Sequence, residues 1–259
     1  MSYFITGTDT HVGKTLISCA LLQAFAAQGL RVVGMKPIAA GGSLHSNGAS
    51  SSVLLAGAEG SNKNGQHEVP QGDNDVIKLR AASNIFASLD QINPYLFSQP
   101  TAPHIAARNS DVHIEIARIL QCYRELAAQA DVVIVEGIGG FCVPINESET
   151  SADMAQQLAL PIILVVGVRL GCLNHALLTM SAIEASGLKC AGWVANVVDE
   201  NMLVRDENIE ALQQRINAPL LGIVPWHPTC SPSMEWVVKR LNILLLDSGG
   251  GVTTQACRA

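Results

Sequence analysis

Short apolar runs alternate with longer amphipathic runs along most of the chain. This alternation is typical of repeated βα units, in which each crossover helix covers one face of a parallel sheet. The apolar runs predict strands at Tyr3–Thr6, Val32–Met35, Val132–Glu136, Ile162–Gly167, Ala191–Asn196 and Leu220–Pro225. The amphipathic runs predict helices at Thr15–Gln28, Ile114–Gln129, Ala152–Leu158, Asn174–Ala185 and Met202–Ile216. The pattern therefore predicts an α/β fold with a parallel sheet flanked by helices.

Length and composition favour one domain, which we expect to span residues 1–247. A chain of 259 residues suits a single α/β domain, and its 48% hydrophobic but only 4% aromatic content suits a buried parallel sheet. Residues 41–72 are dense in Gly, Ser and Asn, which predicts a flexible surface insertion, with an ordered lid as the alternative. Residues 248–259 are expected to form a disordered tail.

Charge and cysteine content narrow the classes of partner. The formal charge of −6, without a local Lys/Arg cluster, argues against nucleic acid or an anionic membrane as partner. Seven cysteines are an odd number without CxxC spacing, which is typical of reduced thiols in a cytoplasmic protein. No apolar run approaches the roughly 20 residues needed to span a bilayer. We therefore expect a cytoplasmic protein with no membrane partner.

The first predicted strand leads into Gly7-Thr8-Asp9-Thr10-His11-Val12-Gly13-Lys14-Thr15. After this loop the predicted helix continues from Leu16 to Gln28. In a phosphate-binding loop of this kind, backbone N–H groups and the helix N-terminus face the phosphates, the lysine reaches them, and the threonine hydroxyl binds Mg²⁺. The spacing is imperfect because Thr8 stands where the strict pattern has glycine. An ordinary helix entry is the alternative, but the strand before and the helix after favour the functional interpretation. The side chain of His11 is either solvated or directly involved.

Two charged residues stand at the ends of predicted strands, where open parallel sheets bind their ligands. Lys36 ends the second strand before Pro37 and can neutralise a transferring phosphoryl group, although a solvated lysine is the alternative. Glu136 ends the strand Val132–Val135, and its carboxylate suits Mg²⁺ together with Thr15. A helix-capping acid is the alternative for Glu136.

Other candidate ligand-binding residues also have a structural explanation or act through their backbone. The backbone of Gly137, Ile138 and Gly139 can approach an anion closely. Asp75 opens a helix-like stretch at Val76–Phe86 and is either an N-cap or a ligand, and Asp73 is an equal candidate. The amide of Asn196 could read a purine edge and Pro225-Trp226 could flank a base, although core packing explains the tryptophan nearly as well.

Several motifs in order along residues 3–226 resemble those of the dethiobiotin synthetase family. Besides the phosphate loop, they are Lys36-Pro37, Asn93-Pro94-Tyr95, Pro100-Thr101-Ala102-Pro103-His104, Glu136-Gly137, Leu170-Gly171-Cys172-Leu173-Asn174-His175, Trp193-Val194-Ala195-Asn196 and Pro225-Trp226. The resemblance implies a P-loop NTPase-like fold and an ATP- and Mg²⁺-dependent ligase. Its substrates would be 7,8-diaminononanoate and CO₂, and ureido ring closure would proceed through a carbamate and a carbamic-phosphoric anhydride to dethiobiotin, ADP and phosphate.

The resemblance also implies roles for particular residues. Lys36 and Lys14 would be catalytic, with Thr15, Asp75 and Glu136 holding the metal. The nucleotide would contact His11, Val12, Gly13, Lys14, Thr15, Leu16, Asp75, Glu136, Gly137, Ile138, Gly139, Asn196, Val197, Val224, Pro225 and Trp226. The substrate would contact Thr10, Lys36, Ala40, Gly171, Cys172, Leu173 and Asn174.

The family is a homodimer, so the segment Gly171–Asn174 would receive the substrate carboxylate across the subunit interface, at a helix start with free N–H groups. Ala40-Gly41 departs from the serine that often follows the Lys-Pro motif, so one possible hydroxyl contact to the substrate is missing.

Two other classes of protein compete with the ligase. A partitioning-type ATPase switch usually has an additional lysine, which residues 7–13 lack, and a cobyrinate-type amide synthetase usually has a glutaminase domain.

Overall fold

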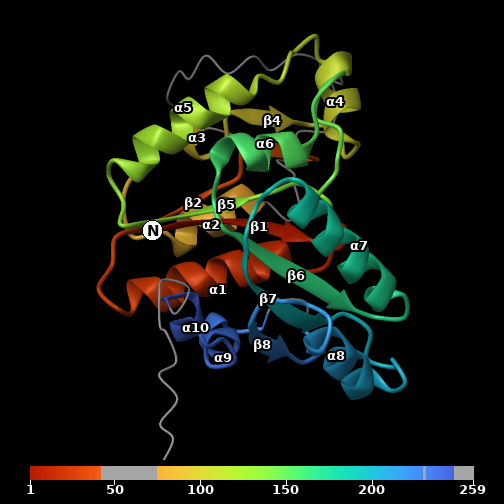
Figure 1. Ribbon diagram of the computed structural model, residues 1–259. Helices are drawn as coiled ribbons and strands as arrows, with labels where there is room; N and C mark the ends of the chain where they lie inside the picture. Colours follow the sequence, from red (N-terminus) through yellow and green to blue (C-terminus); the bar gives the residue numbers. More distant parts are fainter. Residues whose placement is uncertain (42–74, 230–231, 248–259) are drawn as a thin grey trace, which may run out of the picture.

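The predicted strands assemble into one parallel sheet in the computed structural model, which describes residues 1–41, 75–229 and 232–247. The sheet has six strands in the order β2-β5-β1-β6-β7-β8, and every neighbouring pair is parallel (Figure 1). Their bounds are β1 Ser2–Gly7, β2 Val32–Met35, β5 Val132–Glu136, β6 Ile162–Val168, β7 Cys190–Val197 and β8 Leu220–Val224. The predicted fold class is confirmed.

Helices cover both faces of this sheet because successive residues of a strand point to opposite sides. Within β1, Tyr3 and Ile5 join one buried cluster and Phe4 joins the other. The first cluster is covered by α1 Lys14–Ala26, α9 Met234–Val238 and α10 Leu244–Asp247, with α2 Asp75–Ala82 packed on α1 and the edge strand β2. The second is covered by α3 Leu89–Ile92, α4 Pro103–Asn109, α5 Ile116–Ala127, α6 Ser151–Leu158, α7 Cys172–Ala185 and α8 Arg205–Gln213 (Figure 1).

A small second sheet lies beside the main one and was not predicted. It pairs β3 Ile38–Ala40 with β4 Tyr95–Phe97 in parallel. Each strand has three residues, which is too short for a hydrophobic pattern to be recognised. The main chain of Lys36 donates to the carbonyl of Ile92 at 2.8 Å, and the amide of Asn93 donates to the carbonyl of Lys36 at 2.6 Å. The small sheet and these bonds fix the chain immediately after β2.

The predicted helix boundaries needed small corrections. The helix-like stretch Val76–Phe86 is α2, which begins one residue earlier and ends at Ala82, and the predicted helix Met202–Ile216 begins only at Arg205. Val204, the residue before α8, has φ 48°, a left-handed conformation that a β-branched residue rarely adopts and that separates α8 from the preceding loop.

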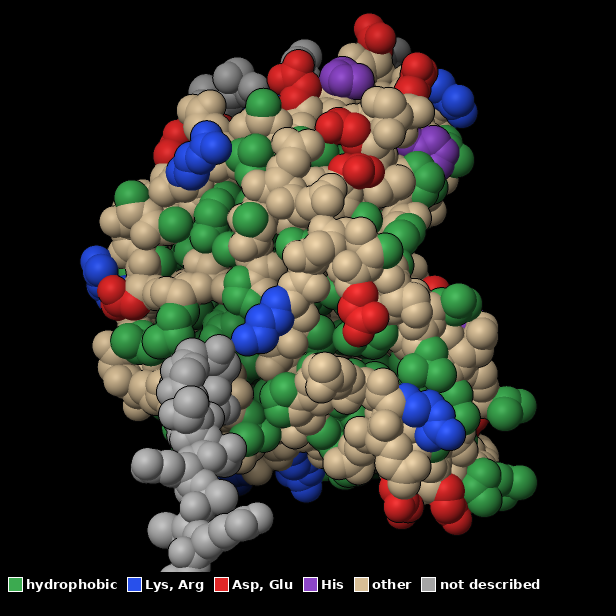
Figure 2. Space-filling view, viewed as in Figure 1, with side chains coloured by type: hydrophobic (Ala, Val, Ile, Leu, Met, Phe, Trp, Pro, Cys, Tyr) green, Lys and Arg blue, Asp and Glu red, His purple; other side chains and the backbone are tan. Residues whose placement is uncertain are grey.

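Nearly all of the predicted insertion 41–72, the candidate ligand Asp73 and the whole predicted tail 248–259 lie outside the described residues. In the described ranges every helix is too short or too polar to cross a bilayer. On the face drawn in Figure 2, Lys and Arg side chains are scattered rather than gathered into one patch. The five cysteines in the described ranges are free thiols rather than disulfide partners.

Candidate active site

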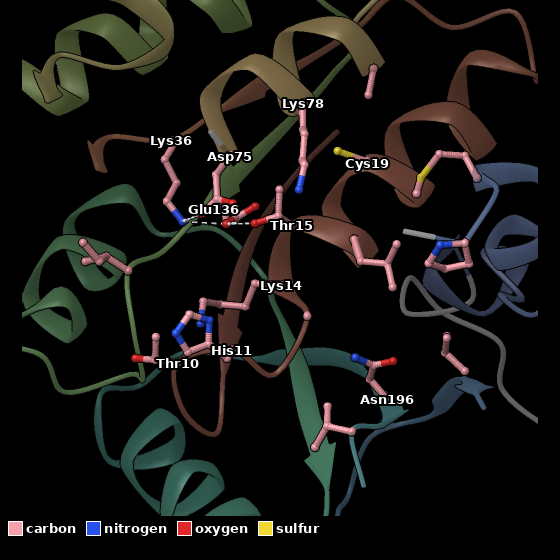
Figure 3. A pocket seen from close by; sticks show the side chains of 18 of the residues that line it. Thr10, His11, Lys14, Thr15, Cys19, Lys36, Asp75, Lys78, Glu136 and Asn196 are labelled. Atoms are coloured by element: carbon pink, nitrogen blue, oxygen red, sulfur yellow. Dashed lines mark hydrogen bonds and ion pairs between the residues drawn. The ribbon is translucent and has the colours of Figure 1, made fainter. Parts of the chain in front are cut away.

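A cleft of about 890 Å³ follows the carboxyl edge of the main sheet (Figure 3). Its lining comes from the loop after β1, the start of α1, the ends of β2, β5, β7 and β8, and one side of α2. The cleft therefore brings together residues that are far apart in sequence. Predicted site residues that line it are Thr10, His11, Gly13, Lys14, Thr15, Leu16, Lys36, Ala40, Asp75, Glu136, Ile138, Gly139, Asn196, Val197, Val224, Pro225 and Trp226.

The loop after β1, residues 7–15, is hereafter the phosphate loop. Gly13 has φ 91°, and a Cβ atom there would lie 2.2 Å from Nδ2 of Asn196, so only glycine fits. The carbonyl of Gly13 accepts its hydrogen bond from the N–H of Ile17. The N–H groups at the first positions of α1 consequently have no intrahelical partner, which makes this helix start a site for an anion.

Lys14 is a buried ammonium group at this helix start, with 7% exposure, and its Nζ donates to the carbonyl of Asp9 at 2.9 Å. Burial, together with the positive charge of Lys36, lowers the pKa of Lys14 from 10.5 to about 8. An anionic ligand beside this ammonium opposes both effects and stabilises the charged form.

A second group, the acid–lysine cluster, consists of Thr15, Lys36, Asp75 and Glu136 (Figure 3). The Lys36 ammonium lies 2.5 Å from Oε1 of Glu136 and 3.2 Å from Oδ2 of Asp75. The hydroxyl of Thr15 donates to the same Glu136 oxygen at 2.8 Å. Burial disfavours the charge on Lys36, but the two carboxylates outweigh it and the pKa of Lys36 is raised. Lys36 is therefore a protonated, fixed positive charge.

The acid–lysine cluster fits a magnesium ion. Oε2 of Glu136 is buried without a hydrogen-bond partner, so this oxygen is available to a cation. Thr15 and Asp75 add a hydroxyl and a second carboxylate, and Mg²⁺ prefers such hard oxygen ligands. The described residues contain no group of three or more His, Cys, Asp and Glu placed to hold a metal. Magnesium bound here would therefore also need oxygen atoms from water and phosphate, which is its usual coordination.

The glycine segment after β5 is only partly available to a ligand. The N–H of Gly137 donates to the carbonyl of Ile5 at 2.9 Å within the sheet, and its carbonyl accepts a bond from Lys36 Nζ at 3.2 Å. Ile138 and Gly139 line the cleft, and Gly139 has φ 63°. Gly137 thus positions Lys36, whereas the next two residues form the cleft wall.

Asn196 lies at the opposite end of the cleft from Lys36 (Figure 3). Its side chain is buried, and the amide Nδ2 donates to the carbonyl of Val12 at 2.8 Å. One amide hydrogen therefore holds the phosphate loop. Nearby, Trp226 is 36% exposed and lines the same end of the cleft after β8, so it is not a core residue.

The sequence interpretation missed several lining residues, which include Cys19, Gln23, Lys78, His227, Thr229 and Met234. Cys19 and Gln23 follow Thr15 at intervals of four residues along α1, and Lys78 follows Asp75 by three along α2. Such intervals place side chains on one helix face, so helical spacing could have revealed them.

The segment Gly171–Asn174 does not line the cleft. Gly171 has φ 94° and precedes the first residue of α7, Cys172, which is 2% exposed. An ion pair between Arg169 and Asp9 connects the loop before this segment to the phosphate loop. Within a single chain the segment is therefore adjacent to the site without entering it.

The sheet order, the phosphate loop and the start of α1 define the class of P-loop NTPase folds. A ParA family ATPase from Chlorobium tepidum has a TM-score of 0.52 at 14% identity, covering 96% of this chain and 93% of that chain. A chain of the MinC:MinD cell division protein complex from Aquifex aeolicus has a TM-score of 0.51 at 15% identity, covering 95% and 89%. At such low identity these similarities show the fold alone.

Sequence comparison is more specific. A family model described as an AAA domain matches residues 1–234. A protein of Aromatoleum aromaticum named ATP-dependent dethiobiotin synthetase is 50% identical over 240 residues, covering 93% of this chain and 97% of that protein. A protein of the same name from Nitrosospira multiformis is 49% identical over 224 residues, covering 86% and 88%. The chain belongs to the dethiobiotin synthetase family, and the resemblance predicted from the motifs is confirmed.

Proposed function

We propose that this protein is an ATP-dependent dethiobiotin synthetase, which closes the ureido ring of 7,8-diaminononanoate with CO₂ and converts ATP to ADP and phosphate. The observation that carries the proposal is the position of the Lys36 ammonium. It lies between the carboxylates of Asp75 and Glu136, in the same cleft as the phosphate loop. This arrangement supports a site that holds a triphosphate and a second anion side by side.

The chemistry needs an activated carboxyl group. One substrate amine attacks the carbon of CO₂ and loses a proton, which gives a carbamate. A carbamate oxygen then takes the γ-phosphoryl group from ATP, releasing ADP and forming a mixed anhydride. The second amine attacks the carbon of the anhydride and loses a proton, the bond between that carbon and the bridging oxygen breaks, and phosphate leaves with this oxygen as the ring closes. A free carbamate lacks such a leaving group.

The protein contributes mainly positions and charges, as in other phosphoryl transfers. Lys14 and the N–H groups of the phosphate loop bind the phosphate chain. Lys36 neutralises the carbamate and the transferring phosphoryl group, and its ion pairs keep it protonated for that role. Magnesium, when bound, would be held by Thr15, Asp75 and Glu136 and would neutralise part of the triphosphate charge.

The two ends of the cleft suit different parts of the reactants. We place the nucleotide base beside Asn196, Val197 and the segment 224–226, where Trp226 offers an exposed ring. We place the diamine near Thr10, Ala40 and the backbone of 138–139, which line the cleft near the acid–lysine cluster. In this arrangement Lys36 lies where the two reactants meet.

We further propose a homodimer in which Gly171–Asn174 of one subunit binds the substrate carboxylate of the other. The N-terminal N–H groups of α7, a 14-residue helix, support a carboxylate at this position. Leu170 and Leu178, which flank the segment, are 90% and 62% exposed, and a subunit interface would bury them.

We also propose a cytoplasmic location, which the free thiols support.

Phosphate release tests the proposal. The purified protein is incubated with MgATP and bicarbonate, with and without 7,8-diaminononanoate, and phosphate and dethiobiotin are measured. We expect both products only when the diamine is present, in equal amounts. Phosphate release that does not change when the diamine is omitted would contradict the ligase and would instead fit a nucleotide-driven switch.

A further inference from the structure

One motif of the sequence, Asn93-Pro94-Tyr95, has no part in the reaction as described so far. Its residues follow α3 and do not line the cleft. They lie instead beside Lys36-Pro37, where the chain leaves β2. The N–H of Tyr95 donates to the carbonyl of Pro37 at 3.1 Å, and the side chain of Asn93 contacts the main chain of Lys36. The motif therefore contacts the residue that carries the fixed positive charge of the site.

The side-chain amide of Asn93 supplies hydrogen-bond donors that the main chain of this segment lacks. The N–H of Asn93 donates to the carbonyl of Leu89 at 2.7 Å, and that of Tyr95 is already used. Pro94 has no N–H group. The amide nitrogen Nδ2 of Asn93 donates to the carbonyl of Lys36 at 2.6 Å and to that of Tyr95 at 3.0 Å. Both amide hydrogens are therefore used to pair main-chain carbonyls.

The surroundings of Asn93 indicate that its donors are needed there. The residue is 6% exposed, and its Oδ1 atom is buried without a hydrogen-bond partner among the described residues. Leaving a buried amide oxygen unpaired is unfavourable. A leucine of similar size would avoid this cost, but it would leave the carbonyls of Lys36 and Tyr95 without their donor. The asparagine is thus explained by the two carbonyls that it pairs.

The bond from Asn93 completes a main chain that is fixed on both sides of the Lys36 side chain. The N–H of Lys36 donates to the carbonyl of Ile92 at 2.8 Å, and its carbonyl accepts from Asn93. Pro37 further restricts the backbone of the residue before it to an extended conformation. A lysine side chain is a flexible four-carbon stem, so its ammonium is placed accurately only if the stem starts from a fixed point. From this point Nζ reaches Oε1 of Glu136 at 2.5 Å.

We propose that Asn93 is a positioning residue for the reaction: its amide holds the carbonyl of Lys36, and this bond keeps the Lys36 ammonium where the phosphoryl group is transferred. Asn93 does not line the cleft, so it acts on the reactants only through Lys36. The proposal deepens the proposed function and rests on it, since Lys36 acts there on the carbamate and the transferring phosphoryl group.

Asn84 is a matched control at the opposite end of β2. Its Oδ1 accepts from the N–H of Val32 at 2.7 Å, and its Nδ2 donates to the carbonyl of Leu30 at 2.8 Å. Like Asn93, it makes two side-chain bonds to the main chain and does not line the cleft. Its loss should weaken the start of the strand without moving the Lys36 ammonium.

Asn93→Ala and Asn84→Ala are compared by the kcat of diamine-dependent phosphate release, the Kd of MgADP and urea unfolding. Asn93→Ala should lower kcat about 100-fold, which is the loss expected when reacting groups are misplaced by about 1 Å. Its Kd for MgADP should be unchanged, because the phosphate loop is intact. Asn84→Ala should lower the urea midpoint but leave both kcat and Kd unchanged.

Asn93→Ser and Asn84→Ser form a milder pair, since each keeps one hydroxyl donor on a shorter side chain. They replace the alanine pair if Asn93→Ala does not unfold cooperatively in urea. In this pair too, kcat should fall only in the variant of Asn93, by a smaller factor than in Asn93→Ala.

Equal kcat values in the Asn93 and Asn84 variants would overturn the proposal. A loss of MgADP affinity as large as the loss of kcat would also overturn it, because it would indicate general damage to the site. Phosphate release by the unmodified protein is measured in parallel. If its diamine dependence is present and the Asn93 variants keep full kcat, only the role of Asn93 fails. If the diamine dependence is missing, the proposed function itself fails.

Discussion

Lys14 in the phosphate loop and Lys36 after β2 are both buried lysines on the walls of one cleft, yet their surroundings shift their pKa values in opposite directions. Lys14 has a backbone carbonyl as its partner, and burial lowers its pKa to about 8. Lys36 has two carboxylates, and they raise its pKa despite burial. The comparison indicates that Lys36 is charged whether or not ligand is bound, whereas the charge on Lys14 comes to depend on a bound anion as the pH rises to about 8 and above.

The largest effect on activity should follow from removing the fixed positive charge of Lys36. Lys36→Ala should reduce diamine-dependent phosphate release by roughly three orders of magnitude, since a charge placed at a transferring phosphoryl group stabilises the transition state strongly. MgADP binding should be largely kept, because the phosphate loop is unchanged. Release and binding are measured on the same preparation, with the exposed Lys239→Ala as control. Full activity in Lys36→Ala would remove Lys36 from the mechanism.

Glu136→Gln should give the next largest effect. The variant keeps the shape of the side chain but weakens both the pairing with Lys36 and the proposed metal site. The magnesium concentration for half-maximal phosphate release should rise roughly 10- to 100-fold. Glu207→Gln, which changes an exposed acid on α8, serves as control. An unchanged magnesium requirement in Glu136→Gln would place the metal elsewhere.

The pH dependence of nucleotide binding tests the other lysine. A phosphate chain favours charged Lys14, so bound nucleotide should raise a pKa that is about 8 in the free protein. The affinity for MgADP should then fall by about tenfold per pH unit above that value, with proton uptake on binding. Calorimetry in buffers of different ionisation enthalpy measures the uptake. An absence of proton uptake above pH 8 would contradict the lowered pKa.

Lys14 also makes the free energy of unfolding depend on pH, but this quantity should rise with pH where the affinity for MgADP falls. Lys14 titrates near its ordinary 10.5 when unfolded and near 8 when folded. Between these values the unfolded chain binds more protons, so the Lys14 contribution to the free energy of unfolding rises with pH across this window. Lys14→Met should remove that contribution, and urea unfolding at several pH values measures it.

The smallest effect concerns the bond from Asn196 to Val12. Asn196→Ala removes a hydrogen bond to the phosphate loop worth about 1 kcal/mol, so affinity should fall a few-fold for MgADP and MgGDP alike. Asn208→Ala, in α8 and away from the cleft, is the control. A loss confined to MgADP would mean that Asn196 mainly reads the base edge.

The sequence predicted those parts of the site that follow local patterns. The short apolar runs that became β1, β2 and β5 were recognisable, and each was followed by a candidate residue at the carboxyl edge of the sheet. Lys14, Lys36 and Glu136 were therefore identified as candidates before the structure was known. Their meeting in one cleft follows from the parallel sheet.

The remaining features depend on contacts between segments. The pairing of β3 with β4 joins two three-residue strands about 60 positions apart, which no local pattern reveals. The bond from Gly137 N–H to Ile5 was likewise invisible, because it requires the strand register. In the sequence Lys78 cannot be told from an ordinary surface lysine. Only the position of α2 beside the cleft shows that Lys78 lines the site.

The phosphate loop, Lys36 and the two carboxylates should surround one magnesium-bound triphosphate. A crystal structure with Mg²⁺ and a non-hydrolysable ATP analogue measures this arrangement. We expect one metal about 2.0–2.1 Å from Oγ1 of Thr15 and from an oxygen of Glu136, with Lys14 on the phosphates of the same nucleotide. A nucleotide bound elsewhere, or a metal that contacts neither Thr15 nor Glu136, would show that these residues do not form one magnesium–nucleotide site.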